Sequence, residues 1–194
     1  MVYKFCSYID NLLTKDIANN FLDLVAIGMV ADMMDVRNFE TKELIRRGFV
    51  QIRNPFIKGI IDRDQFHFTG EITQHKIAFY LVPLINAVTR VGTLKDKTVL
   101  FESMLEHKAY NLISSTKRGE KGLEEKIVTQ AVRMCTNVKK AQTNEQDKYS
   151  IIVKTLIEEE NLLEHKILLV RLSPDHAANA NLTGLIANKI ANEY

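Results

Sequence analysis

Residues 21–36 read FLDLVAIGMVADMMDV, the most apolar stretch of the chain and the one that decides which kind of core it can build. The stretch has sixteen residues and contains three aspartates, whereas a membrane-spanning helix needs about 20 apolar residues. Leucine, alanine and methionine accompany valine and isoleucine in it, which favours a helix over a buried strand. We therefore expect a buried helix from Leu22 to about Ala31.

Most of the sequence around this stretch also carries helical signals. The spacing of apolar residues predicts further helices over residues 3–14, 41–52, 75–91, 98–113, 123–141, 151–163 and 181–193. The helix over 41–52 should end at Asn54-Pro55, because the residue before a proline avoids the helical region. Pro83 should kink the helix over 75–91 or divide it into two shorter elements.

Two segments depart from the helical pattern. Residues 62–74 are polar and predict a connection with little regular structure, the expected internal seam. Residues 166–172, KILLVRL, form a short apolar run bounded by charge and by Ser173-Pro174, which predicts the one strand of the chain. The expected fold class is mainly α, with a short strand-helix unit at the C-terminus.

The composition is that of a globular protein with a real core. The 194 residues are 46% hydrophobic and 26% charged, which excludes collagen, coiled-coil rods and disordered tails. The net charge is only +2, so any nucleic-acid partner must meet a local basic patch. Cys6 and Cys135 lie far apart in apolar patterns and are interpreted as reduced core thiols. The N-terminal residues resemble no secretion signal, so we expect a cytoplasmic protein without a membrane partner.

Asp32 is the first residue that could carry chemistry. It stands at the end of the apolar segment, where an ionised carboxylate is costly unless a cation, a metal or several donors lie nearby. One interpretation is therefore a metal ligand. The other is that Asp32 or Asp35 closes the helix with a turn-type hydrogen bond at the surface.

The region from residue 117 to 140 is the most basic part of the chain. It holds three glutamates and seven basic residues, Lys117, Arg118, Lys121, Lys126, Arg133, Lys139 and Lys140, a local net charge of +4. Phosphate contact is one interpretation, and a solvated helix face with internal Glu–Lys pairs is the other. Asn86 and Arg90, four residues apart, could together bind an anion on one helical face or form a buried structural pair.

Three stretches resemble a known family in the same order along the chain. LDLVAIGMVADMMDV (22–36) resembles the fourth motif of the DHH phosphoesterases in the RecJ branch, which reads much like LDLVALGTVADVVPL. IAFYLVPLINAVTRVG (77–92) is similar to the RecJ stretch IGFRIAPRINAAGRL, with Val88-Thr89 where RecJ proteins have Ala-Gly. ANLTGLIANKIANEY (180–194) is similar to the GVIGIVASRL segment that opens the DHH-associated C-terminal domain.

The resemblance implies an internal fragment of a RecJ-like protein. The DxD and DHH motifs of the family's N-terminal part and the GGHxxAAG signature of its C-terminal domain are absent from this chain. Residues 1–61 would be the end of the DHH catalytic domain, 62–164 a helical connecting region, and 165–194 the start of the substrate-binding domain. The expected partners within one parent chain are thus the missing N-terminal DHH part and the C-terminal domain.

The resemblance also implies a reaction and a set of residues. The parent would hydrolyse phosphodiester bonds of single-stranded DNA from the 5′ end with Mn²⁺ or Mg²⁺, whereas the isolated chain should be inactive. Asp32 would bind one metal, and Asn86 and Arg90 would lie near the scissile phosphate. Arg90 would be catalytic together with Asp32, because it would neutralise charge on that phosphate. The nucleic-acid contacts would come from Asn86, Arg90, Lys117, Arg118, Arg133, Lys139 and Lys140. The competing class is a non-catalytic helical module that binds nucleic acid or a protein through residues 117–140.

Overall fold

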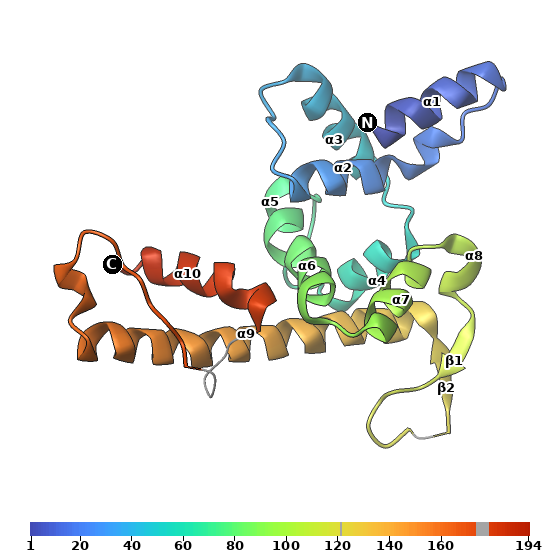
Figure 1. Ribbon diagram of the computed structural model, residues 1–194. Coiled ribbons are helices and arrows are strands. Elements are labelled where there is room, and N and C mark those ends of the chain that lie inside the picture. Colours follow the sequence, from blue (N-terminus) through green and yellow to red (C-terminus); the bar gives the residue numbers. More distant parts are fainter. Residues whose placement is uncertain (121, 174–178) are drawn as a thin grey trace.

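The computed structural model describes residues 1–120, 122–173 and 179–194, and it confirms a mainly α-helical protein (Figure 1). The longest helix, α9 (Ile127–Glu159), forms the base on which the other elements are arranged. Its 33 residues span about 50 Å at the usual rise per residue. The further α-helices are α1 (Val2–Leu12), α2 (Leu22–Ala31), α3 (Phe39–Val50), α4 (Pro55–Arg63), α5 (Gln74–Lys76), α6 (Val82–Val91), α7 (Leu94–Ser103), α8 (Glu106–Ala109) and α10 (Thr183–Ala191).

The remaining elements are short. Strands β1 (Leu112–Ser114) and β2 (Glu124–Lys126) pair antiparallel, with Leu112 opposite Lys126. Single turns of 3-10 helix lie at Ala18–Phe21 (η1), Leu162–Glu164 (η3) and Ala180–Leu182 (η5), and a π-helical turn lies at Ile77–Leu81 (η2).

The apolar residues Leu22–Ala31 form α2, as predicted, and α2 packs along α3. Ala26 and Ile27 are buried in this contact region. Gly48 of α3 permits the close approach, because a Cβ atom there would lie 2.3 Å from the Leu22 carbonyl oxygen. The two helices form a layer above α4 and α6 in Figure 1.

Two buried polar side chains join α2 to the start of α4. The Asp23 carboxylate accepts the backbone N–H groups of Arg53 and Asn54, each at 2.7 Å. Asn54 in turn caps α4, since its Oδ1 accepts the N–H of Phe56 at 3.1 Å. The predicted break at Asn54-Pro55 is confirmed, but the sequence analysis missed that the same pair begins a new helix. Proline suits that first turn because its absent N–H would have no helical partner there.

The main hydrophobic core lies between α4, α6, α7 and the N-terminal half of α9. Ile57 and Ile60 precede the polar segment 62–74, Ile77 and Leu81 follow it, and all four side chains share this core. Residues 65–73 form turns and irregular backbone, as predicted. The boundary proposed between residues 61 and 62 stays a prediction.

Pro83 is accommodated by a π-helical turn. The chain runs from α5 through η2 into α6, and Pro83 occupies the first turn of α6. A regular helix would place the proline ring against the carbonyl four residues earlier, whereas a π turn is wider at that point. The predicted division of the 75–91 helix is therefore confirmed, with residues 77–81 as its irregular part.

Three predicted helix boundaries near α9 were wrong. The helix expected over 98–113 ends at Ser103 and is followed by α8 and β1. The helix expected from Leu123 begins at Ile127, because residues 124–126 pair as β2. The polar gap expected between 141 and 151 is helical, since Gln142 and Ser150 are buried there instead of facing solvent.

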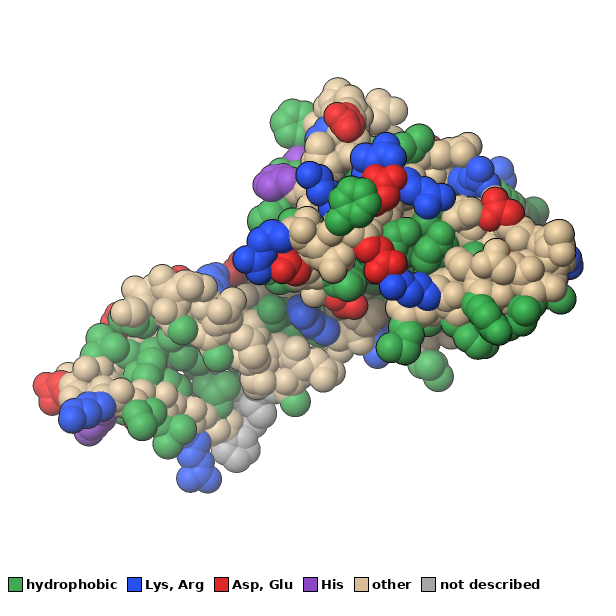
Figure 2. Space-filling model, turned by 90° about the horizontal axis from the view of Figure 1, so that it is seen from above, with side chains coloured by type: hydrophobic (Ala, Val, Ile, Leu, Met, Phe, Trp, Pro, Cys, Tyr) green, Lys and Arg blue, Asp and Glu red, His purple; other side chains and the backbone are tan. Residues whose placement is uncertain are grey.

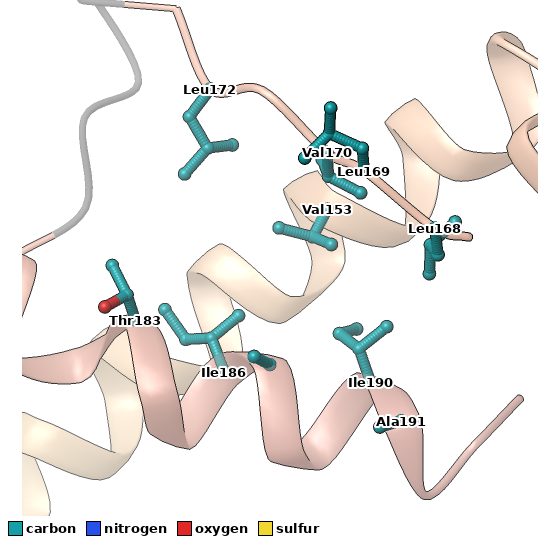
Figure 3. A pocket seen from close by; sticks show the side chains of 10 residues that line it. Val153, Leu168, Leu169, Val170, Leu172, Thr183, Ile186, Ile190 and Ala191 are labelled. Atoms are coloured by element: carbon teal, nitrogen blue, oxygen red, sulfur yellow. The ribbon is translucent and has the colours of Figure 1, made fainter.

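A second hydrophobic cluster covers the C-terminal half of α9. Val153 and Ile157 of α9 pack against Leu182, Ile186 and Ile190 from η5 and α10. In Figure 2, hydrophobic side chains line a hollow on the smaller part of the molecule, which the C-terminal half of α9 and α10 form. The hollow corresponds to an apolar cavity of about 480 Å³ between α9, α10 and residues 168–172 (Figure 3).

The strand predicted over 166–172 is not formed. A strand needs a neighbour that completes its backbone hydrogen bonds, and within the described residues the sheet consists of β1 and β2 alone. Val170 and Leu172 pack on the second cluster, while Leu169 stays exposed beside the cavity. The final helix is confirmed as α10, which follows η5 directly, and Asn179 caps η5 by accepting the backbone N–H of Asn181.

The first helix forms as predicted but exposes most of its apolar side chains. Phe5 is 66% exposed, and Leu12 is exposed as well. Cys6 is exposed too, so its assignment as a core thiol was wrong, whereas Cys135 is buried as predicted. Burial raises the pKa of the Cys135 thiol to about 12. No helix among the described residues is long and apolar enough to cross a membrane.

Candidate nucleic-acid interface

A cavity of about 430 Å³ opens where the end of α2, the η2–α6 segment, α9 and α10 meet. We call it the notch. Its polar lining residues come from two helices and are Asn86 and Arg90 of α6 and Lys139, Gln142 and Gln146 of α9. Its apolar wall consists of Val30, Ala31, Met33, Ala78, Phe79, Val82, Pro83 and Leu185. None of the described residues that line the notch carries a negative charge.

Arg90 is placed in the notch by the last turn of α6. Its side chain is exposed, and it forms no ion pair with any residue that the structure describes. A contact from η5 holds this turn in position, because the Asn181 amide donates a hydrogen bond of 3.0 Å to the Arg90 carbonyl. Arg90 thus presents a guanidinium group to the notch without a competing carboxylate.

Lys139 faces Arg90 from α9 and is half-buried. Burial lowers the pKa of Lys139, and the nearby charge of Arg90 lowers it further. Its Nζ donates a hydrogen bond of 3.2 Å to Oε1 of Gln142. Two cations held on opposite walls repel each other, so an anion between them would be stabilised by both.

Gln142 lies one helical turn after Lys139 and is only 1% exposed. Its Nε2 has no hydrogen-bond partner among the residues that the structure describes. A buried donor without a partner is uncommon in a folded protein, and here the residue that carries it lines the notch, although the Nε2 atom itself is buried. The notch therefore has a buried, unpaired amide beside its two cations.

Asp32 lies at the rim of the notch, as the C-cap of α2. Its side chain is exposed, and the residues on either side of it, Ala31 and Met33, line the notch. Asp35 is engaged elsewhere, since its carboxylate pairs with Arg37 at 2.8 Å and accepts the Arg37 N–H in a turn. Throughout residues 1–120, 122–173 and 179–194, no group of three His, Cys, Asp or Glu side chains is arranged to hold a metal.

The basic residues of the 117–140 region do not share one helical face. Lys117 and Arg118 lie in the connection between β1 and β2, beyond the N-terminal end of α9. Lys117 forms an ion pair with Glu120. Lys139 and Lys140 lie on α9, about 20 Å along the helix from its start. Lys121, counted in the basic stretch, falls outside the described residues.

Arg133 is bound to a glutamate. Its two terminal nitrogens donate to the Glu125 carboxylate at 2.5 and 2.6 Å, and the side chains are only 17% and 10% exposed. This pairing lowers the pKa of Glu125 and raises the pKa of Arg133. The guanidinium therefore joins β2 to α9, which argues against the predicted phosphate contact.

The structure thus brings together three of the predicted site residues, Asn86, Arg90 and Lys139, with Asp32 at their edge. It places the predicted contacts at Lys117, Arg118, Arg133 and Lys140 outside the notch. The sequence analysis missed Gln142 and Gln146. A signal for them existed, because residues 139, 142 and 146 are spaced three and four apart and so share one face of α9.

Fold and site define a helical protein with a cationic notch where α2, α6, α9 and α10 meet, and no carboxylate lines this notch among the described residues. No family model matches the chain. The whole chain is, however, 36% identical to YorK of Bacillus subtilis strain 168 and to YorK of Bacillus phage SPbeta. The phage protein bears the name "Putative single-strand DNA-specific exonuclease yorK", and the chain spans 33% of the length of either relative.

Proposed function

We propose that the chain is the central part of a RecJ-like exonuclease that hydrolyses single-stranded DNA from the 5′ end, and that the notch holds the backbone of the strand. The proposal rests on the similarity to YorK over the whole chain and on the three family-like stretches. Because the chain corresponds to a third of those relatives, the activity belongs to a longer protein.

One observation carries the proposal. Arg90 and Lys139, which lie 49 positions apart, converge on one cavity without a carboxylate partner in the described chain. Charge-assisted hydrogen bonds from such cations are the usual contacts to phosphate oxygens. Asn86 adds a neutral donor, so the notch can bind a phosphodiester through several groups at once.

The described residues do not fit a complete two-metal centre. Asp32 is a single exposed carboxylate, and no group of three potential ligands lies around it among the described residues. We therefore derive no catalytic step through a metal from this chain. The Mn²⁺ or Mg²⁺ that the resemblance implies is proposed only for a longer protein in which further carboxylates lie beside Asp32.

The first test measures binding and cleavage by the chain alone. Fluorescence anisotropy should show tighter binding of a single-stranded oligonucleotide than of the matching duplex, because a narrow notch admits one backbone. With Mn²⁺ present, labelled DNA should stay intact, since one carboxylate cannot hold two divalent ions. Cleavage that disappears in Asp32→Asn would overturn the assignment of the chain as a fragment.

The second test restores the rest of the protein. In a chimera, this chain replaces the third of YorK that it matches. The chimera should degrade single-stranded DNA with Mn²⁺, and Asp32→Asn should remove most of this activity without changing the circular dichroism spectrum. An unaltered rate in a folded Asp32→Asn chimera would end the metal-ligand assignment. A folded chimera that binds DNA but never cleaves it would favour the non-catalytic binding module.

A further inference from the structure

Phe79 is an aromatic residue that lies outside both hydrophobic clusters. It lies in the π-helical turn η2 and is 64% exposed, although the residues around it, Ile77 and Leu81, are fully buried. Exposure alone would be ordinary, because single apolar side chains often lie on a protein surface, but this ring stands in a π-helical turn. π-helical turns are frequent at functional sites, where they redirect side chains.

The ring of Phe79 is held in place from one side. His75, one turn earlier, stacks on it with ring centroids 4.4 Å apart and an interplanar angle of 28°. The neighbouring Tyr80 is turned inward instead and stacks on His67 at 4.0 Å. Phe79 therefore has one ring face covered by an imidazole, and its own exposure leaves the opposite side available to a planar ligand.

The position of Phe79 relative to the cations is equally specific. It lines the notch together with Arg90 and Lys139. It also lines a second cavity of about 340 Å³ on the side of Arg63 and Tyr80, and Phe79, Pro83 and Lys139 form the wall that both cavities share. A strand whose phosphate lies between Arg90 and Lys139 would carry its base past this wall.

We propose that Phe79, supported by His75, is the stacking platform for a base of the single strand in the notch. This inference rests on the proposed function and adds a base contact to the phosphate contacts. Stacking on an aromatic ring does not depend on base identity, because every base has a π face. It requires an unpaired base, so the platform would also favour single strands over duplexes.

The test uses a tryptophan reporter, since the chain contains no tryptophan. The Phe79→Trp variant contains one tryptophan, at position 79. A base that stacks on its indole ring quenches the fluorescence of that ring. Phe101→Trp is the matched control, because Phe101 is also 64% exposed but lies on α7 and lines neither cavity. A thymidine oligonucleotide should quench the residue 79 reporter and leave the residue 101 reporter unchanged. An abasic oligonucleotide of equal length should quench neither.

Affinity measurements separate this inference from the proposed function. Phe79→Ala should weaken binding of the thymidine oligonucleotide about 5- to 150-fold and leave binding of the abasic one unchanged. Phe79→Leu, which keeps apolar bulk without a ring, should behave like Phe79→Ala. Arg90→Ala should weaken both oligonucleotides alike. If the wild type binds both equally and the reporter is silent, stacking is overturned while backbone binding stands. If the wild type binds neither, both proposals fall.

Discussion

The notch and the β1–β2 hairpin both carry cations, but the two regions treat them differently. In the notch, Arg90 and Lys139 have no carboxylate partner among the described residues. At the hairpin, Lys117 is paired with Glu120 and Arg133 with Glu125. Figure 2 shows the same proximity of opposite charges on the larger part of the molecule, where acidic side chains lie beside most basic ones on the visible face.

The difference teaches that charge counted along the sequence is not charge available to a ligand. A cation already bound to a carboxylate must give up that pair before it can bind a phosphate, and for the mostly buried Arg133–Glu125 pair this would leave a carboxylate without its cation. A cation held beside another cation gains from any anion that arrives. The +4 of residues 117–140 therefore overstates what the hairpin can contribute.

The largest effect should follow from Arg90→Ala. A charge-assisted hydrogen bond to phosphate is worth about 1.5–3 kcal/mol, so the affinity for single-stranded DNA should fall about 10- to 150-fold. Arg90→Lys should recover part of it, because the charge remains but the planar fork is lost. Anisotropy titrations at one fixed salt concentration measure the change. Equal affinities for Arg90→Ala and the wild type would remove the notch from the interface.

Arg133→Ala should act on stability and not on binding. The change leaves the mostly buried Glu125 carboxylate without its partner, which should cost about 2–3 kcal/mol of unfolding free energy in urea. The stabilisation by this pair should also depend on pH, in a direction that the pKa of Glu125 sets. Arg133 lowers the pKa of folded Glu125, so the stabilisation is present above the unfolded pKa of glutamate and is lost as the pH falls through the folded pKa.

The matched control for this pair is Arg133→Ala with Glu125→Ala. The double variant should recover part of the lost stability, because no unpaired charge remains. The single variant should keep wild-type affinity for DNA once it is folded. A folded Arg133→Ala protein with the salt slope of binding reduced would instead restore Arg133 to the interface.

Lys139 should give the binding its pH dependence. Since burial and Arg90 lower its pKa, Lys139 loses its proton at a lower pH than an exposed lysine does. Binding should therefore weaken, by about fivefold for one lost contact, as the pH rises toward that pKa. Lys139→Arg stays charged and should keep its affinity over the same range. Identical alkaline profiles of the two proteins would exclude Lys139 from phosphate contact.

The smallest effect is expected from the hairpin. On single strands, each phosphate contact contributes roughly 0.7 to the slope of log affinity against log salt. Because Lys117 is already paired, the Lys117→Ala, Arg118→Ala double variant should lower the slope by at most one such contact. A salt series on the double variant decides this. A fall in the slope of about two contacts would mean that both Lys117 and Arg118 bind phosphates, and that Lys117 breaks its pair with Glu120 to do so.

Much of the helical architecture could be predicted from local patterns. The apolar run at 22–31, the stripe on residues 183–191 and the irregularity at Pro83 all depend on periodicity or on the chemistry of one residue. The predictions that failed depended on distant partners. Residues 142–150 look like a loop in sequence, but in α9 Gln142 and Ser150 are buried and Gln146 donates to the Leu185 carbonyl of α10.

By itself, the sequence determined the fold class, the buried α2 helix and the identities of Asn86, Arg90 and Lys139 as candidates, because spacing and hydrophobicity are local properties of the chain. Only the tertiary structure decided which candidates lie together. It brought Arg90 opposite Lys139, paired Arg133 with Glu125 and turned Phe79 outward. The physical reason is that the availability of a charge or a ring depends on its neighbours in space, and those neighbours come from helices far apart along the chain.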